Sequence, residues 1–150
     1  MADATQTYEL DRFIEAQNGV YGQALEELKA GRKRSHWMWF IFPQIAGLGA
    51  SHMSEKYAIR SADEASAYLA DPILGPRLNR CVEAMLSVQD RTAHAILGSP
   101  DDLKFRSSMT LFASISEAGS PFHQALDRFY DSQPDERAIA LLKAGAPPPQ

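Results

Sequence analysis

The amino-acid sequence predicts an all-α protein, folded as a single multihelical globular domain over residues 1–150. Three observations predict this class. Apolar residues recur at spacings of three and four along most of the chain, which is the period of a helix with one buried face. Prolines repeatedly stand in the first turn of an expected helix, after a serine or aspartate that can cap it. The strict alternation of apolar and polar residues that marks a half-buried strand is nearly absent.

The composition fits one folded domain. The chain has 150 residues, close to the commonest domain size. Hydrophobic residues make up 45% and charged residues 23%, near the average of globular proteins, which argues against disorder along the whole chain. We expect the core to run from about residue 8 to residue 143, with frayed termini at 1–6 and 145–150.

Helical patterns begin near the N-terminus. Apolar spacing predicts one helix over 8–16 and a second over 21–28. A short helix is predicted over 54–59. Ser61 and Glu64 then form a capping box for the helix that follows them.

The later helices are predicted from their first turns. Prolines indicate helix starts near Pro72, Pro100, Pro121 and Pro134. Proline suits such positions because the first helical residues leave their amide hydrogens unpaired anyway. A shorter helix is expected over 92–97. No solenoid-length repeat and no linker divides the chain.

A dense aromatic segment separates the early helices from the later ones. Both tryptophans and two of the seven phenylalanines fall within residues 37–42. We interpret it as a short helical turn or an extended piece, and 38–42 is the one stretch that could compete as a strand. Apolar groups on both faces predict a path through the middle of the domain. The residues expected to be mostly buried are Trp37, Trp39, Phe40 and Phe42.

Charge, cysteine content and hydropathy exclude several classes of protein. The net charge of −4 gives no overall attraction to nucleic acid, and the basic run 32–34 is short, so no nucleic-acid partner is expected. Cys81 is the single cysteine, which excludes an internal disulfide and a cysteine-based zinc site. Without a membrane-spanning segment or a signal-peptide pattern, we expect a cytoplasmic protein with no membrane partner.

Standard catalytic and cofactor fingerprints are absent from the sequence. It contains no glycine-rich nucleotide-binding motif, no zinc-protease motif, no serine-hydrolase elbow and no EF-hand loop. The four histidines show no close ligand pairing. The sequence therefore predicts no metal and no cofactor, and it leaves the oligomeric state open.

A polar stretch after the aromatic segment is a first candidate for ligand binding. Within 47–54, Ser51 and Ser54 follow two glycines, so backbone amides and hydroxyls could face an anion there. Arg34 could supply positive charge, and Gln44 would be held by the rigid aromatic segment. The alternative is an ordinary connection in which Ser51 or Ser54 caps a helix.

Two further positions carry candidate chemistry. Lys104 and Ser108 are neighbours one helical turn apart and could anchor a ligand or another helix. A serine nucleophile at this place would need a base, and the local sequence shows none. Glu55, close to Tyr57 and the aromatic segment, is a candidate general acid or base. The alternative is a solvated glutamate in a first helical turn.

Longer motifs resemble a known family. They are Trp37-x-Trp39-Phe40-Ile41-Phe42-Pro43-Gln44, Gly47-Leu48-Gly49-x-Ser51-x-x-Ser54-x-x-Tyr57, Tyr68-Leu69-x-Asp71-Pro72-x-Leu74-Gly75 and Lys104-x-x-Ser107-Ser108-Met109-Thr110-Leu111-Phe112. By these motifs the chain is identified as a member of the largely bacterial family called domain of unknown function 1810. The resemblance implies a multihelical cytoplasmic protein and no established activity. Members are often labelled calpastatin, but the Thr-Ile-Pro-Pro-x-Tyr-Arg motif of calpastatin repeats is absent here.

A shorter stretch resembles a second group of proteins. Ser54-Glu55-Lys56-Tyr57 is similar to the Ser-Glu-His-Tyr stretch of the YbiA-like NADAR superfamily, with Lys56 in place of the histidine. Those proteins are small, mainly helical hydrolases of N-glycosidic bonds in ribosylated nucleotides or bases. The resemblance implies a catalytic role for Glu55.

Two functions follow as hypotheses. The first is a small-molecule-binding domain or hydrolase for a ribosylated or nucleotide-like ligand. Its pocket would be lined by Trp37, Trp39, Phe42 and Tyr57, and its polar contacts would come from Arg34, Gln44, Ser51, Ser54, Lys104 and Ser108. The alternative is a noncatalytic protein-interaction module that uses the aromatic segment 37–42.

Overall fold

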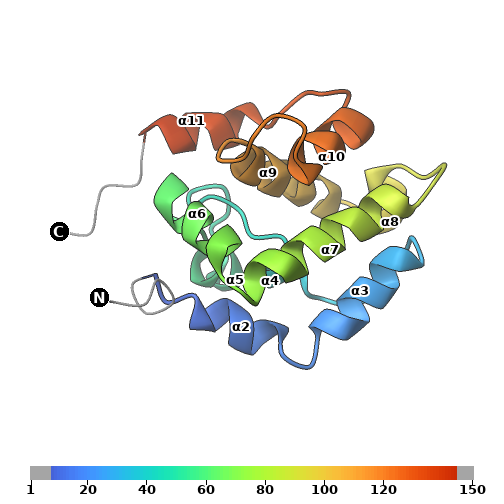
Figure 1. The fold of residues 1–150 in the computed structure, drawn as a ribbon, viewed down its shortest axis with the longest axis horizontal. Coiled ribbons are helices and arrows are strands. Elements are labelled where there is room, and N and C mark those ends of the chain that lie inside the picture. Colours follow the sequence, from blue (N-terminus) through green and yellow to red (C-terminus); the bar gives the residue numbers. More distant parts are fainter. Residues whose placement is uncertain (1–7, 145–150) are drawn as a thin grey trace.

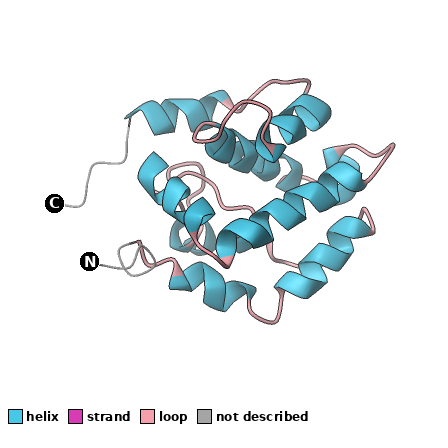
Figure 2. Cartoon of the chain, viewed as in Figure 1, coloured by secondary structure: helices cyan, strands magenta, loops and turns pink. Residues whose placement is uncertain are grey.

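The computed structural model describes residues 8–144, and within that part the chain forms ten helices and no strand (Figures 1 and 2). The helices are α2 (Asp11–Gln17), α3 (Tyr21–Lys29), α4 (Met38–Ile41), α5 (His52–Lys56), α6 (Ala62–Ala70), α7 (Leu74–Ser87), α8 (Ala93–Leu97), α9 (Asp101–Ala113), α10 (Pro121–Tyr130) and α11 (Glu136–Ala144). The predicted all-α class is confirmed. The predicted frayed termini, 1–6 and 145–150, lie outside the described residues.

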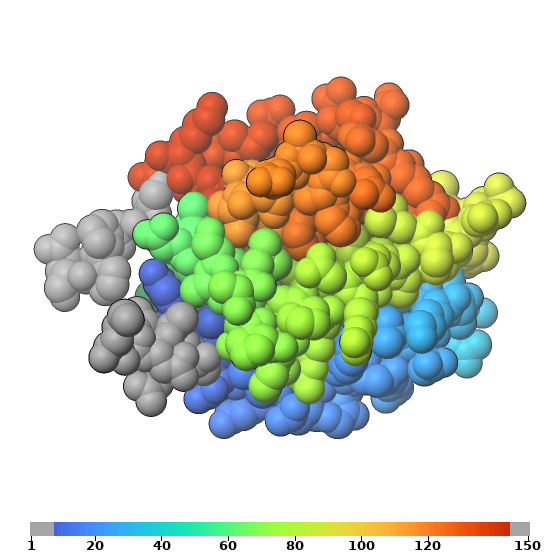
Figure 3. All heavy atoms as spheres, viewed as in Figure 1, coloured from blue at the N-terminus to red at the C-terminus, as the bar shows by residue number. Residues whose placement is uncertain are grey.

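Helices α7 and α9 organise the core. Helix α7 packs against α3, α6 and α10, and α9 packs against α6, α8, α10 and α11. The side chains of α6 and α7 lie across one face, between the N-terminal helices and the C-terminal ones (Figure 3). None of the helices in the described range is both long enough and apolar enough to cross a lipid bilayer.

The close packing of α6 and α7 depends on one glycine. A Cβ atom added at Gly75 would lie 2.2 Å from the carbonyl oxygen of Leu69. Nonbonded carbon and oxygen atoms cannot approach to that distance. Only glycine therefore lets the first turn of α7 lie so close to the end of α6.

Most predicted helix starts are confirmed, with shifts of a few residues. Helix α10 begins at Pro121, and the Ser120 hydroxyl accepts a hydrogen bond from the backbone amide of His123. Helix α7 begins two residues after Pro72, because the Asp71 carboxylate accepts bonds from the amides of Ile73 and Leu74 and forms a turn first. The short helix predicted over 54–59 lies nearer the N-terminus, since α5 begins at His52 and ends at Lys56.

The predicted capping box of α6 is half formed. The Ser61 hydroxyl accepts from the amide of Glu64 at 3.1 Å, as expected. The Glu64 carboxylate does not return to Ser61. It accepts from the amide of Arg60 and from the guanidinium of Arg12 on α2. The local bond is therefore made to the residue before Ser61 through Oε1, and the second oxygen, Oε2, pairs with Arg12.

The aromatic segment is a single helical turn, α4, so the competing strand interpretation of 38–42 is wrong. It enters the core as a chain of rings, in which Phe42 contacts Trp37 on one side and Phe105 of α9 on the other, at centroid distances of 6.2 and 4.8 Å. Trp37, Phe40 and Phe42 are buried, as predicted. Trp39 is only half-buried, because its ring lies at the surface beside Lys104.

Candidate functional site

The structure separates the predicted site residues into two groups. One group surrounds the first half of α9 and contains Trp37, Trp39, Phe42, Lys104 and Ser108. The other lies along the connection from α4 to α6 and contains Gln44, Ser51, Ser54, Glu55 and Tyr57. No hydrogen bond, ion pair or ring contact joins the two groups directly within residues 8–144.

The buried aromatics of the first group have no surface to offer a ligand. Trp37 and Phe42 are both 0% exposed. The Trp37 indole nitrogen donates to the Glu27 carboxylate at 3.0 Å, so its single polar atom is already satisfied inside the protein. Trp37 and Phe42 therefore belong to the core on which the exposed residues of this group lie.

The accessible part of this group is a small cationic and aromatic area, here called the Trp39–Lys104 surface. It comprises Trp39, Asp101 and Lys104, and the Lys33 ammonium, whose side chain is only 9% exposed, pairs with Asp101 from the protein side. The Lys104 ammonium lies 5.3 Å from the centre of the Trp39 ring, within the range of a cation–π contact. Asp101 pairs with Lys33 at 2.9 Å and more loosely with Lys104 at 3.6 Å. Arg34 is exposed next to Lys33. Two ammonium groups and one carboxylate therefore lie together here, and no side-chain contact joins Arg34 to them.

Ser108 lies one turn from Lys104 but faces the core. It is 0% exposed, and its hydroxyl has no hydrogen-bond partner among the described residues. A buried hydroxyl without a partner is unfavourable, so Ser108 is an unexplained feature of α9.

In the second group, the hydrogen bonds fit the alternative stated for this stretch, an ordinary connection in which Ser51 caps a helix. The Ser51 hydroxyl accepts from the amide of Ser54 at 3.1 Å, and the two hydroxyls are 2.9 Å apart. Tyr57 is buried against Phe13 and Phe40. These contacts hold α5 against the N-terminal part of the fold.

Gln44 and Glu55 form no side-chain contact with Trp39, Asp101 or Lys104. The backbone carbonyl of Gln44 accepts from the amide of Ile59, in the isolated bridge that pairs Ile45 with Ile59. Glu55 is exposed on the five-residue helix α5 and forms no ion pair or side-chain hydrogen bond with any described residue. The structure does not bring it to either tryptophan or to Lys104.

Sequence analysis assigned no role to Glu27, which lies in the helix predicted over 21–28. Glu27 is buried, and its carboxylate accepts from the amides of Arg34 and Ser35, from the Ser35 hydroxyl and from the Trp37 indole. Burial raises the pKa of Glu27, but these hydrogen bonds outweigh it and lower the pKa from 4.5 to about 2. Glu27 thus fixes the chain between α3 and α4, including the buried ring of Trp37.

Glu27 is expected to make the stability of the protein depend on acid pH. Because its pKa is lower in the folded state, the stabilisation is complete above about pH 4.5 and is lost as the pH falls toward 2. The lowered pKa is worth roughly 3 kcal/mol. Glu27→Gln should be less stable than the unmodified protein at neutral pH, and the difference should shrink between pH 4.5 and 2. Urea unfolding across that range measures it.

Glu26→Gln is the matched control, since Glu26 is the exposed neighbour on the same helix. It should change the free energy of unfolding by only a few tenths of a kcal/mol at any pH. A pH-independent loss for Glu27→Gln would contradict the lowered pKa.

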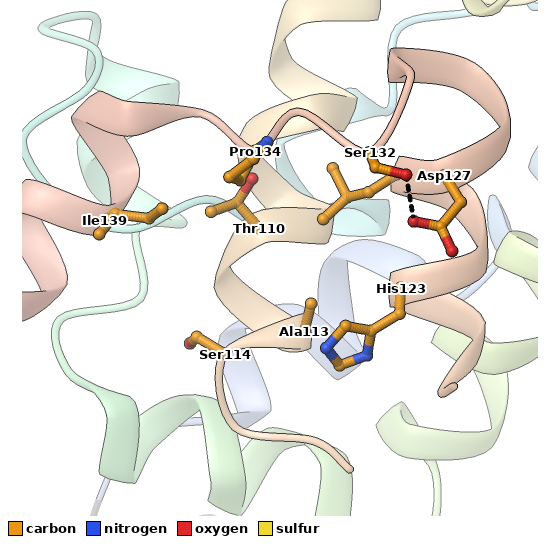
Figure 4. A pocket seen from close by; sticks show the side chains of 9 residues that line it. Thr110, Ala113, Ser114, His123, Asp127, Ser132, Pro134 and Ile139 are labelled. Atoms are coloured by element: carbon orange, nitrogen blue, oxygen red, sulfur yellow. Dashed lines mark hydrogen bonds between the residues drawn. The ribbon is translucent and has the colours of Figure 1, made fainter. Parts of the chain in front are cut away.

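A separate concavity lies between α9, α10 and α11 (Figure 4). It has a volume of about 260 Å³ and apolar walls from Ala113, Leu126, Pro134 and Ile139. Its polar residues are Thr110, Ser114, His123, Asp127 and Ser132. Sequence interpretation missed this site, because its residues come from three helices and the connections between them and form no local motif. Within 8–144 no three His, Cys, Asp or Glu side chains gather as a metal site requires.

Fold and surface together define a small all-helical domain with a half-buried tryptophan beside a lysine. The chain belongs to the family described as protein of unknown function, DUF1810, which it matches over residues 7–142. The family resemblance inferred from the motifs is confirmed. No curated protein matches the chain, and the resemblance to the NADAR superfamily is not confirmed.

Among solved structures, the chain is similar to the conserved hypothetical protein Rv1873 from Mycobacterium tuberculosis, known from a crystal structure. The two sequences are 49% identical, and the TM-score is 0.89. The match covers 91% of this chain and 98% of that chain. The similarity supports the helical fold over nearly its whole length, and as a conserved hypothetical protein Rv1873 suggests no activity.

Proposed function

We propose that this protein is a small-molecule-binding domain that takes an anionic, nucleotide-like ligand at the Trp39–Lys104 surface. The observation that carries the proposal is the pairing of a half-buried indole with a partly exposed ammonium 5.3 Å from its ring. A planar base can stack on such a ring, and a phosphate can bind the adjacent cation.

The charges around Trp39 support an anion. Lys33 is held by Asp101 at 2.9 Å, whereas Lys104 lies 3.6 Å from the same carboxylate and keeps more of its capacity to bind a phosphate. The surface also lies at the N-terminal end of α9, where the helix dipole favours negative charge.

The buried residues next to Trp39 and Lys104 are tightly packed. Trp37 is fully buried and bonded to Glu27, and Phe42 packs against Phe105 of α9. These contacts join α4, which carries Trp39, to α9, which carries Lys104. Holding both groups in place before the ligand arrives lowers the entropic cost of binding.

Hydrolysis of an N-glycosidic bond through Glu55 stays a hypothesis. The exposed position of Glu55 on α5, without a contact to Lys104 or to either tryptophan, gives it no support from geometry. The interaction-module alternative has little apolar surface available, because three of the four aromatic side chains of 37–42 are buried. We therefore propose binding alone.

Binding of ADP-ribose and ADP tests the proposal. Trp37 is buried, so a ligand that stacks at the surface should change the fluorescence of Trp39. Lys104→Gln should weaken the affinity about tenfold or more, because a charged hydrogen bond is worth about 1.5–3 kcal/mol. Trp39→Phe should keep much of the affinity, and Trp39→Leu should lose it.

Lys143→Gln is the control, because Lys143 is an exposed lysine at the far end of α11. It changes the net charge equally and should leave the dissociation constant unchanged. The proposal is wrong if neither nucleotide binds, or if Lys104→Gln and Trp39→Leu bind as tightly as the unmodified protein.

A further inference from the structure

The side chains that line the concavity between α9, α10 and α11 offer more hydrogen-bond acceptors than donors. Three hydroxyls line it, and each has already used its single proton within the protein. Thr110 donates to the carbonyl of Arg106, Ser114 to that of Leu111, and Ser132 to the carboxylate of Asp127. A hydroxyl has one proton and two lone pairs, so Ser114 and Ser132 can only accept from a ligand. Thr110 also accepts from the backbone amide of Asp135, which leaves it one lone pair.

The one charged group in the concavity is a carboxylate. One oxygen of Asp127 accepts from Ser132 at 2.7 Å, and Asp127 forms no ion pair with any described lysine, arginine or histidine. Its neighbour Arg128 is committed elsewhere, to the carbonyls of Leu86 and Val88. The second carboxylate oxygen is free to accept a hydrogen bond.

The single possible donor in the lining is His123. Its Nδ1 atom lies 2.7 Å from the hydroxyl of Ser120, the residue that caps α10. The ring therefore has one nitrogen left for the concavity. Figure 4 shows His123, Asp127 and Ser132 on one side of the site and Ile139 on the other.

We propose that this concavity binds a small organic ammonium ion with an apolar body. The ammonium group brings three donors and a positive charge to a site that offers acceptors and an unpaired carboxylate. The body would pack against Leu126, Pro134 and Ile139. A volume of about 260 Å³ lies just below the roughly 300–1,000 Å³ of sites for drug-sized ligands, so the ligand is a small amine.

The site is independent of the Trp39–Lys104 surface in residues and in sign of charge. The surface has an excess of positive groups on α9 and before α4, whereas the concavity has one carboxylate and lies toward α10 and α11. Loss of nucleotide binding would leave this proposal untouched, and the reverse also holds.

Three probes of equal carbon skeleton test the chemical class. Isopentylammonium, isopentanol and isovalerate differ in the head group, which is cationic, neutral or anionic. Titration followed by NMR should show that isopentylammonium binds and shifts the ring resonances of His123 and the amide of Asp127. The alcohol should bind at least about tenfold more weakly, because it offers one donor and no charge. Isovalerate should not bind.

Asp127→Asn tests the residue that the proposal depends on. Asp127 is exposed at the rim of the concavity, and the amide keeps its shape, so the variant should fold. Its affinity for isopentylammonium should fall about tenfold or more. Asp131→Asn is the matched control, because it removes an exposed carboxylate four residues away that does not line the concavity. Asparagine also tolerates the left-handed backbone at that position (φ 55°).

Three results would overturn the proposal. The first is no binding of isopentylammonium at millimolar concentrations. The second is equal affinity for the ammonium, the alcohol and the carboxylate, which would make the site a merely apolar hollow. The third is an unchanged affinity in Asp127→Asn, or an equal loss in Asp131→Asn, which would reduce the effect to general attraction of cations.

Discussion

Trp37→Ala is expected to destabilise the protein by about 3–5 kcal/mol, the range measured for large aromatic side chains removed from cores. Trp37 is 0% exposed, and its ring contacts Phe42. The substitution also removes the indole donor from the Glu27 carboxylate, which stays buried with one partner fewer. Urea unfolding at neutral pH measures the loss.

Trp39→Ala provides the internal comparison. Trp39 belongs to the same helical turn but is half-buried, so less apolar area returns to water and the loss of stability should be clearly smaller. Equal losses for the two variants would contradict the different burial of the two rings. A loss below about 1 kcal/mol for Trp37→Ala would mean that the aromatic chain through Phe42 does not carry the core.

Arg12→Ala is expected to cost about 3 kcal/mol, because Arg12 joins α2 to the connection between α5 and α6. Its guanidinium donates to the carbonyls of Lys56 and Ala58 and pairs with Glu64 at 2.8 Å. Glu64 is 3% exposed, so the substitution leaves a buried carboxylate without its cation. Breaking one side of a buried ion pair typically costs about 3–5 kcal/mol, and the partial exposure of Arg12 sets the lower value.

A double variant separates the ion pair from the other contacts of Arg12. In Arg12→Ala with Glu64→Gln, no unpaired charge stays buried, and the glutamine oxygen can still accept from the amide of Arg60. The double variant should therefore be more stable than Arg12→Ala alone. If the double variant is less stable than the single one, the buried charge is not the cause of the loss. Guanidinium chloride would screen the pair, so urea is the suitable denaturant.

Local signals in the sequence were sufficient for the helical class and for most helix positions. Ser120 and Pro121 begin α10 because a serine cap and a first-turn proline act within one turn of the chain. Ser61 caps α6 for the same reason. The motifs from Trp37 to Gln44 and from Lys104 to Phe112 were specific enough to give the family, which matches over residues 7–142.

The sequence also contained part of the candidate site. Trp39 and Lys104 were both predicted, and they meet at 5.3 Å although 65 positions separate them. Their contact could not be predicted, because it depends on the packing of Phe42 against Phe105. That packing joins two segments that are distant in the sequence, so the local pattern of neither segment predicts it.

Only the tertiary structure decided which polar residues are buried and which are free. Glu26 and Glu27 look alike in sequence, yet the chain folds back after α3 and surrounds Glu27 with four donors, while Glu26 stays in water. His123 and Ser132 are close to Asp127 in sequence, but the concavity that they line with it forms only because α9 and α11 pack beside α10 and contribute Thr110 and Ile139. Helix formation depends on neighbours within a turn, so sequence by itself determines it well. The environment of a charge depends on groups brought from distant segments, and only the packed fold determines that.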